Sequence, residues 1–245
     1  MLVDSYMSPE RNARIRQLLA LRQSDLTICL EQVHKPHNVS ALLRSCDAVG
    51  VHEMHAVWQE RAKIRKGTAM GSQNWVYTHE HASIEDAVGQ LKKQNMQVLV
   101  TNLSDNAVDF RQIDYTQPTA IILGQEKHGA TEEAIALADT DIVIPMVGMV
   151  QSLNVSVAAA LVLYEAQRQR QIAGMYDQLQ LSEEQCQKVL FEGGFPRLRE
   201  ICQRKGVRYP YIDEQGYIQE DEAWWRQVQM DAERYKTFQA EQDKA

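Results

Sequence analysis

The chain of 245 residues lacks several features that would place it in particular protein classes. Its four cysteines stand far apart and form no C-x-x-C pair, which argues against a disulfide framework or a thiolate zinc site. The longest apolar run, 157–163, is far shorter than the roughly 20 residues that span a bilayer. The first residues lack the basic region and apolar core of a secretory signal. We therefore expect a soluble, cytoplasmic protein with no membrane partner.

The net charge of −7 gives no general attraction to nucleic acids, but the charge is unevenly distributed. Residues 213–245 hold nine acidic and four basic side chains and so contribute −5. Basic side chains elsewhere form three groups, which could meet a phosphate backbone locally, although solvated helix faces explain such groups equally well. The groups are Arg11, Arg14, Arg16 and Arg22; Arg61, Lys63, Arg65 and Lys66; and Arg197, Arg199, Arg204, Lys205 and Arg208.

Strand-like and helix-like segments alternate along the middle of the chain. β-Branched and apolar runs predict strands at 26–33, 51–58, 97–101, 119–123 and 142–144. Helical spacing predicts helices at 39–49 after an N-cap at Asn38, at 83–94, and at 132–138 after an N-cap at Thr131. This alternation predicts an α/β fold with a mainly parallel sheet and helices on both faces. An amphipathic helix is expected before residue 25, and irregular, helical structure from residue 181 onward.

Three polar or glycine-containing segments lie where ligands bind to parallel sheets, at the carboxyl ends of predicted strands. They are 38–44, 124–129 and 145–156. The third has small residues, among them Gly148, Ser152 and Ser156, which let one backbone pass close to another. The chain has no G-x-G-x-x-G fingerprint, so a conventional Rossmann-type nucleotide site is poorly supported.

The letters of these segments, NVSALLR, LGQEKHG and IPMVGMVQSLNVSVA, resemble the three motifs of the SPOUT class of RNA methyltransferases. The resemblance is to the 2′-O-methyltransferase branch and extends over nearly the whole chain. It implies a C-terminal trefoil knot and a homodimer whose sites are completed at the subunit interface. It also implies three parts: an N-terminal helical RNA-binding extension (1–25), a catalytic domain (26–170) and a C-terminal helical extension (171–245).

The same resemblance implies the reaction and its partners. A methyl group would pass from S-adenosyl-L-methionine to the ribose 2′-hydroxyl of guanosine-18 in the D-loop of tRNA. Two alternatives remain open: a 2′-O-methyltransferase that acts on ribosomal RNA, and a catalytically silent RNA-binding module with the same fold. A small-molecule α/β enzyme is a weaker possibility.

The resemblance also assigns roles to individual residues. It implies Arg44 as the catalytic arginine, oriented by Asn38. The further catalytic positions are Glu126, Ser152 and Asn154; the donor is cradled by backbone around Thr101, Gly124, Ile144, Met146 and Leu153. The first candidates for RNA phosphate contacts are Arg11, Arg14, Arg16 and Arg22.

Chemistry limits what Arg44 can do in this reaction. A guanidinium stays protonated at neutral pH, so we interpret Arg44 as an electrostatic activator of the ribose oxygen rather than as the base. The structural alternative is an ion pair between Arg44 and Asp47, which are three residues apart on the predicted helix. For Asn154, a role as helix cap is expected in addition to any catalytic role.

Histidine pairs raise the question of a metal. His34 and His37 are three residues apart, as are His52 and His55. Because His52 and His55 would point to opposite faces of a strand and no thiolate lies nearby, we expect no metal site. The aromatic residues Trp224, Trp225 and Tyr235 are expected to pack a terminal helix.

Overall fold

A computed structural model describes residues 5–58, 71–231 and 234–235. The chain divides into two compact units: a core unit of residues 21–180, and a terminal unit of residues 1–20 and 181–245. The divisions fall after residues 20 and 180, and not after residues 25 and 170 as expected. The two terminal extensions, which were expected as separate parts, belong to one unit. The basic group at residues 61–66 lies outside the described residues.

The core unit contains a seven-stranded sheet in the order β3-β2-β1-β6-β4-β7-β5, and every pair of neighbouring strands is parallel. The central strands β1 and β6 are buried along their whole length, as expected for strands covered on both faces. The strands are β1 (Leu26–Glu31), β2 (Glu53–Val57), β3 (Tyr77–His81), β4 (Gln97–Thr101), β5 (Val108–Asp109), β6 (Thr119–Leu123) and β7 (Thr140–Val143). The mainly parallel sheet predicted from the sequence is confirmed; the edge strands β3 and β5 were not predicted.

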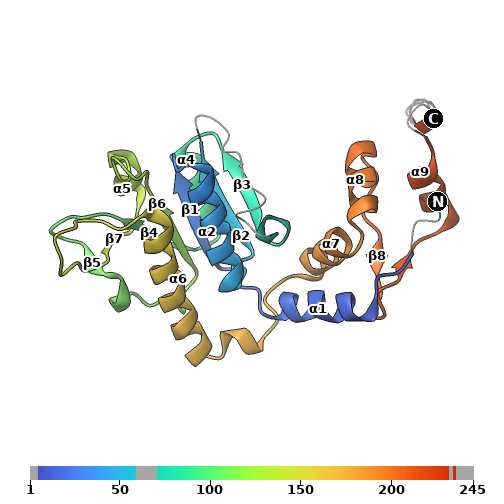
Figure 1. Ribbon diagram of the computed structural model, residues 1–245, viewed down its shortest axis with the longest axis horizontal. Coiled ribbons are helices and arrows are strands. Elements are labelled where there is room, and N and C mark those ends of the chain that lie inside the picture. Colours follow the sequence, from blue (N-terminus) through green and yellow to red (C-terminus); the bar gives the residue numbers. More distant parts are fainter. Residues whose placement is uncertain (1–4, 59–70, 232–233, 236–245) are drawn as a thin grey trace. The chain divides into compact units, whose positions relative to one another are not determined.

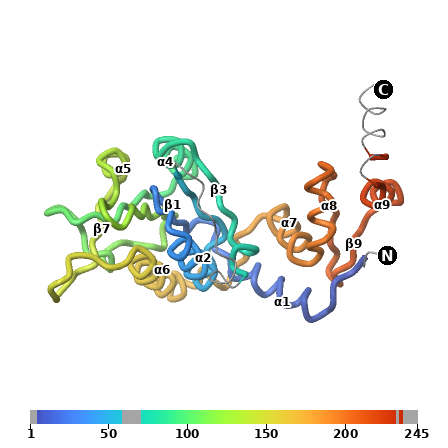
Figure 2. Tube along the Cα trace, turned by 45° about the horizontal axis from the view of Figure 1, so that its top comes forward, coloured from blue at the N-terminus to red at the C-terminus, as the bar shows by residue number. Residues whose placement is uncertain are grey.

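Helices cover both faces of this sheet, as Figure 1 and Figure 2 show. On one face, α2 (Pro36–Ala48) and α6 (Val155–Ile172) pack against each other and share a large apolar cluster with Leu26, Ile28 and Leu30 of β1. On the other face, α4 (Ile84–Lys93) and α5 (Glu132–Leu137) contribute to a second apolar cluster. Short 3-10 turns are η1 (Ser72–Asn74), η2 (Phe110–Gln112) and η3 (Met175–Asp177).

The start of α2 differs from the prediction. The helix begins at Pro36 after an N-cap at Lys35, so Asn38 lies inside the first turn and is not its cap. Proline suits this position because its fixed φ fits the helix and its missing N–H would have no partner there. The cap at Thr131 is confirmed, since its hydroxyl accepts a hydrogen bond from the Ala134 amide at 3.1 Å.

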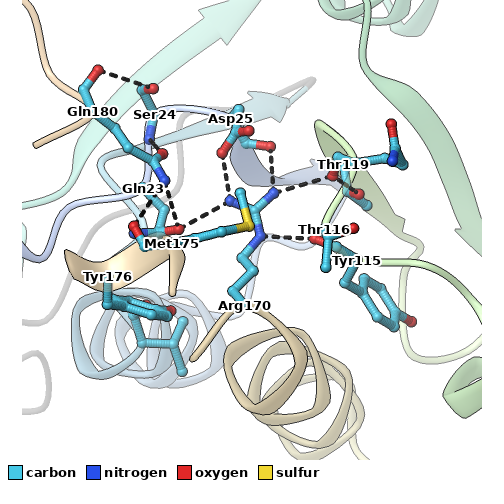
Figure 3. Close-up of polar contacts among 12 residues, drawn as sticks. Gln23, Ser24, Asp25, Tyr115, Thr116, Thr119, Arg170, Met175, Tyr176 and Gln180 are labelled. Atoms are coloured by element: carbon cyan, nitrogen blue, oxygen red, sulfur yellow. Dashed lines mark hydrogen bonds and ion pairs between the residues drawn. The ribbon is translucent and has the colours of Figure 1, made fainter. Parts of the chain in front are cut away.

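A fully buried arginine holds the edge of the sheet opposite the carboxyl ends of its strands (Figure 3). Arg170, near the end of α6, forms an ion pair with Asp25 and donates to the carbonyl oxygens of Tyr115 at 2.8 Å and Gln117 at 3.1 Å. It also donates to the side chain of Gln23, which accepts a hydrogen bond from Gln180. These contacts bind residues 23–25 and 170–180 into the core unit, which explains why its limits lie outside those predicted.

The terminal unit is built from helices and a two-stranded hairpin. Its elements are α1 (Pro9–Ala20), α7 (Glu183–Gly194), α8 (Pro196–Lys205), β8 (Tyr211–Ile212), β9 (Ile218–Gln219) and α9 (Glu222–Gln229). The hairpin was not predicted. Trp224 is buried and donates to the Arg208 carbonyl at 3.0 Å, and the buried Lys205 ammonium lies over the ring of Tyr235. None of the described helices is long and apolar enough to cross a bilayer.

The Arg170 network yields a prediction for stability. Arg170→Met should lower the free energy of unfolding by about 3–5 kcal/mol, because it leaves Asp25 and several carbonyls without their partner. Arg168→Met is the matched control: Arg168 lies two positions earlier on the same helix and forms an exposed pair with Glu165, worth about 0–1 kcal/mol. Denaturant titration of both variants would contradict the role of Arg170 if they lost equal stability.

Candidate active site

A pocket of about 330 Å³ opens at the carboxyl ends of β4, β6 and β7. This volume is within the range of small-molecule sites, about 300–1,000 Å³. Its walls come from three segments: the end of β4 with the residues after it, the loop 123–129, and the loop 142–153 that leads into α6. Ligands of parallel sheets collect at this edge, so the pocket is where the sequence predicted a site.

The loop that follows β6 is closed so tightly that only glycine fits at its start. A Cβ atom on Gly124 would lie 2.1 Å from the Ala130 backbone nitrogen and 2.4 Å from the Gly129 carbonyl oxygen. The Gly129 amide donates to the Gln125 carbonyl at 2.9 Å, and Gly129 has a positive φ of 71°. The backbone of this loop is thereby fixed as a wall of the pocket.

Two polar contacts hold the pocket rim. The Glu126 carboxylate forms an ion pair with the Lys35 ammonium, which links the pocket loop to the N-terminus of α2. The Asp141 carboxylate accepts hydrogen bonds from Asn102 at 2.8 Å and Ser104 at 2.9 Å, and so fastens the segment after β4 to β7. Each contact ties one loop of the site to a neighbouring element.

An amide pair joins α2 to the start of α6. The Asn154 side chain donates to the Asn38 side-chain oxygen at 3.2 Å. The Asn154 side-chain oxygen accepts from the Ser156 amide at 2.9 Å, so the expected capping of α6 by Asn154 is confirmed. Asn38 is buried, and its amide nitrogen has no hydrogen-bond partner among the described residues. This buried amide nitrogen can donate a hydrogen bond to a group that enters the site.

Arg44 is exposed on α2 and forms no hydrogen bond or ion pair with the described residues. The alternative pairing with Asp47 is wrong, because the Asp47 carboxylate accepts from Arg22 at 2.5 Å and from Ser72 at 3.3 Å. Arg44 also does not line the pocket of its own chain. Its charge is therefore not compensated by any of the residues that the structure describes.

The structure separates the predicted site residues into two groups. All five residues expected around the donor line the pocket, together with two of the expected catalytic residues. These pocket residues are Thr101, Gly124, Ile144, Met146, Leu153, Glu126 and Ser152. The remaining three, Asn38, Arg44 and Asn154, do not line it; Asn38 and Asn154 are joined to it through the start of α6.

The four arginines expected to contact RNA differ in how far their guanidinium groups are buried or hydrogen-bonded within the chain. Arg22 is buried, pairs with Asp47 and donates to the Val51 carbonyl at 2.9 Å, so it cannot contact a phosphate as expected. Arg11 donates to the Gly193 carbonyl, and Arg16 donates to Asn12 and to the Asp213 carbonyl. Arg14 is exposed and, within the described part of the chain, its guanidinium has only a long contact with Gln17, at 3.3 Å.

His55 of β2 forms a stacked group with two histidines of β3, and not with His52, its neighbour in the sequence. The His55 ring stacks on those of both His79 and His81, and His55 Nδ1 lies 2.8 Å from His81 Nε2. Burial and the two neighbouring imidazoles lower the pKa of His55 to about 4, which keeps it neutral at neutral pH. Among the described residues, no group of three or more His, Cys, Asp or Glu side chains could hold a metal ion.

Sequence reasoning missed several residues of this site. Lys35 carries no signal for its ion pair with Glu126, because the two residues are 91 positions apart. Asn102 and Asp141 could have been found, since each is a polar residue in or beside a strand that borders the pocket. His128 also lines the pocket and belongs to the second motif.

Comparisons with known proteins find matches over most of the chain. Residues 25–164 match the SpoU rRNA Methylase family, and residues 168–221 match the C-terminal part of SpoU rRNA methylases. The tRNA (guanosine(18)-2′-O)-methyltransferase of Escherichia coli K12 is 60% identical over 226 residues, which cover 91% of this chain and 99% of that protein.

Solved structures give the same result. The TrmH/SpoU tRNA modifying enzyme of A. aeolicus is 43% identical, with a TM-score of 0.73 over 76% of this chain and 96% of that one. The SpoU methyltransferase AviRb from Streptomyces viridochromogenes, in complex with AdoMet, is 27% identical, with a TM-score of 0.56 over 62% of this chain and 63% of that one. The similarity is consistent with the knotted α/β fold that the sequence motifs implied.

The closed loop at Gly124 yields a prediction for ligand binding. Gly124→Ala should displace the loop, because the added Cβ meets backbone atoms, and should weaken binding of S-adenosylhomocysteine by about 10- to 100-fold. Gly89→Ala on α4 is the control, since nothing lies within 4 Å of its Cβ position. Calorimetric titration would measure both variants. Parent-like affinity in Gly124→Ala would show that the loop is not part of the donor site.

Proposed function

Because the chain belongs to the SpoU rRNA Methylase family, we propose that it transfers a methyl group from S-adenosyl-L-methionine to the 2′-hydroxyl of guanosine-18 in the D-loop of tRNA. The observation that carries this proposal is the 60% identity, over 91% of the chain, to a tRNA (guanosine(18)-2′-O)-methyltransferase. The pocket at the carboxyl edge of the sheet, whose walls contain residues of the second and third motifs, supports the same conclusion.

The pocket residues fit the proposed donor. S-Adenosyl-L-methionine supplies an electrophilic methyl group on a positively charged sulfur. Gly124 and Gly129, whose backbones pack against each other, line the pocket, and Leu153 and Ile144 offer apolar surface to an adenine ring. The Glu126 carboxylate, which Lys35 holds at the pocket, presents a second oxygen whose negative charge a sulfonium would favour. AdoMet is the cofactor in the AviRb complex, which supports the same pocket chemistry.

Arg44 supplies the charge that activates the ribose oxygen. A neutral 2′-hydroxyl is a weak nucleophile, so a fixed cation beside it stabilises the negative charge that develops as it attacks. Arg44 has no partner among the described residues, so its guanidinium is free for this role. Asn38, held by Asn154, presents a buried amide donor close to the start of α6 and orients the site.

We assign the site to a homodimer. Arg44 lies on α2 outside the pocket of its own chain, so a second copy is needed to bring an Arg44 to each pocket. The neighbouring helix α6 carries an exposed apolar stripe of Val157, Leu161 and Tyr164, at four- and three-residue steps. Exposed apolar surface of this kind is typical of an interface between subunits.

The core unit and the terminal unit then have different roles. The core unit carries the donor pocket, and the terminal unit offers basic side chains such as Arg14 to the tRNA phosphates. Such contacts make binding weaker as salt rises, because binding releases cations that the RNA had condensed around it. The proposed place of action is the cytoplasm, where tRNA is found.

A second candidate is methylation of ribosomal RNA, which the description of the matching family favours. The donor pocket and Arg44 would serve that reaction equally well. Only the identity of the methylated RNA therefore distinguishes this candidate from methylation of tRNA. A silent RNA-binding module would bind tRNA without incorporating methyl groups.

The test uses labelled S-adenosyl-L-methionine with an unmodified tRNA transcript, a transcript carrying 2′-deoxyguanosine at position 18, and ribosomal RNA fragments. We expect label only in the first, recovered as 2′-O-methylguanosine at position 18. Label in ribosomal RNA alone would favour the second candidate. Binding of tRNA without label in any RNA would contradict both methyltransferase proposals.

The role of Arg44 is tested in the same assay. Arg44→Ala should lower turnover by about 100- to 1,000-fold, the usual cost of losing one donor to a developing oxyanion. Binding of S-adenosylhomocysteine should be unchanged. Arg111→Ala is the control, since Arg111 is exposed and pairs with the nearby Asp109. A fully active Arg44→Ala variant would remove Arg44 from the mechanism.

The homodimer is tested by Leu161→Arg, which places a charge in the centre of the apolar stripe. We expect a monomer in sedimentation analysis and loss of methyl transfer, because an isolated chain has no Arg44 at its pocket. Gln171→Arg is the control, since Gln171 is exposed near the end of the same helix. An active monomer would contradict the shared site.

A further inference from the structure

A buried carboxylate lies beside the pocket loop without lining the pocket. Glu31 is the last residue of β1 and is only 3% exposed. Both of its oxygens accept hydrogen bonds from one residue: from the Thr131 amide at 2.9 Å and from the Thr131 hydroxyl at 2.5 Å. Removing a carboxylate from water is costly, so its two bonds to a single residue require a reason.

Thr131 directly follows the loop that forms the pocket wall. Its hydroxyl also accepts from the Ala134 amide and so begins α5. Leu30 of β1 pairs with Leu123 of β6, which places Glu31 level with Gly124, at the other end of the loop. Glu31 thereby fastens the end of the loop to the strand that neighbours its beginning.

A displacement of Thr131 would reach the pocket because the loop is tightly packed against itself. Ala130 and Gly129 lie against Gly124 with no room for a single methyl group. A shift of Thr131 moves Ala130, and with it the backbone that lines the pocket. Glu126 lies on the same loop, so its carboxylate would move too.

The sheet itself does not require a carboxylate at this position. The residues of β1 on the same face as Glu31 are Thr27 and Cys29, and Cys29 packs in the apolar cluster with Ala134 of α5. An apolar side chain there would extend that cluster. The carboxylate instead fixes the orientation of Thr131, because its two oxygens accept from both the amide and the hydroxyl of that residue.

We propose that Glu31 is a positioning residue of the donor site: through Thr131 it holds the loop 124–130 in the conformation that binds S-adenosyl-L-methionine. This inference rests on the proposed function. Glu31 does not line the pocket and acts only through the loop, so its loss acts on donor affinity more than on turnover at saturating donor.

The variant that tests it is Glu31→Gln, which keeps the size of the side chain but turns a donor toward Thr131 in place of one acceptor. The dissociation constant for S-adenosylhomocysteine should rise by about 10- to 100-fold, the cost of a small misplacement transmitted to a site. The KM for S-adenosyl-L-methionine should rise with it, with a smaller change in kcat and unchanged tRNA affinity. Thr131→Val should reproduce this pattern, and Thr131→Ser, which keeps both contacts, should retain the donor affinity of the parent.

The control is Asp139→Asn. Asp139 also accepts a hydrogen bond from a backbone amide of the sheet, that of Val98 at 2.7 Å, but it lies just before β7, at the edge of the sheet away from the pocket. We expect a loss of stability in thermal unfolding without a change in donor affinity. Parent-like donor affinity in Glu31→Gln, or equal weakening in Asp139→Asn, would overturn the assignment of Glu31.

These results separate the two proposals. If the parent protein binds S-adenosylhomocysteine but methylates no RNA, the proposed function fails, and the titrations still decide the role of Glu31. If the parent methylates tRNA and Glu31→Gln binds donor equally well, only the role of Glu31 fails. If the parent does not bind S-adenosylhomocysteine, both proposals fail.

Discussion

The pocket at the carboxyl ends of β4, β6 and β7 depends on the close approach of two backbone segments at Gly124. A Cβ atom there would lie 2.1 Å from the Ala130 nitrogen, so the loop after β6 can fold back in this way only with glycine at position 124. Glu31 fastens one end of this loop, and the Lys35–Glu126 pair ties its tip to α2.

The arginines of the core unit show how burial separates structural roles from chemical ones. Arg170 and Arg22 are buried, and each is held by a carboxylate and by backbone carbonyls, so their charges are already compensated. Arg44 lies three residues from Asp47, yet Asp47 is occupied by Arg22. This pair thus leaves the exposed guanidinium of Arg44 without a partner among the described residues, which is what the proposed role on an incoming substrate requires.

The sequence predicted the parts of this fold that depend on local chemistry. The buried strands β1 and β6, the cap at Thr131 and the cap at Asn154 follow from residue type and spacing. The predicted start of α2, with Asn38 as its cap, was wrong because Pro36 is itself a first helical residue, a position that suits proline. Three contacts with carboxylates join residues that are far apart in the sequence. Glu31 and its partner are 100 positions apart, Lys35 and its partner 91, and Arg170 and its partner 145, so no local pattern predicts these contacts. Periodicity also cannot show a knot, which depends on how the chain threads.

The most direct test of this account is a crystal structure of the protein with S-adenosylhomocysteine. The account predicts the ligand in the pocket at the ends of β4, β6 and β7, with its adenine against Ile144 and Leu153 and with an Arg44 of the second copy at the side of the pocket from which the ribose oxygen approaches. A ligand bound elsewhere on the chain, or in that pocket with every Arg44 turned to solvent, would contradict it.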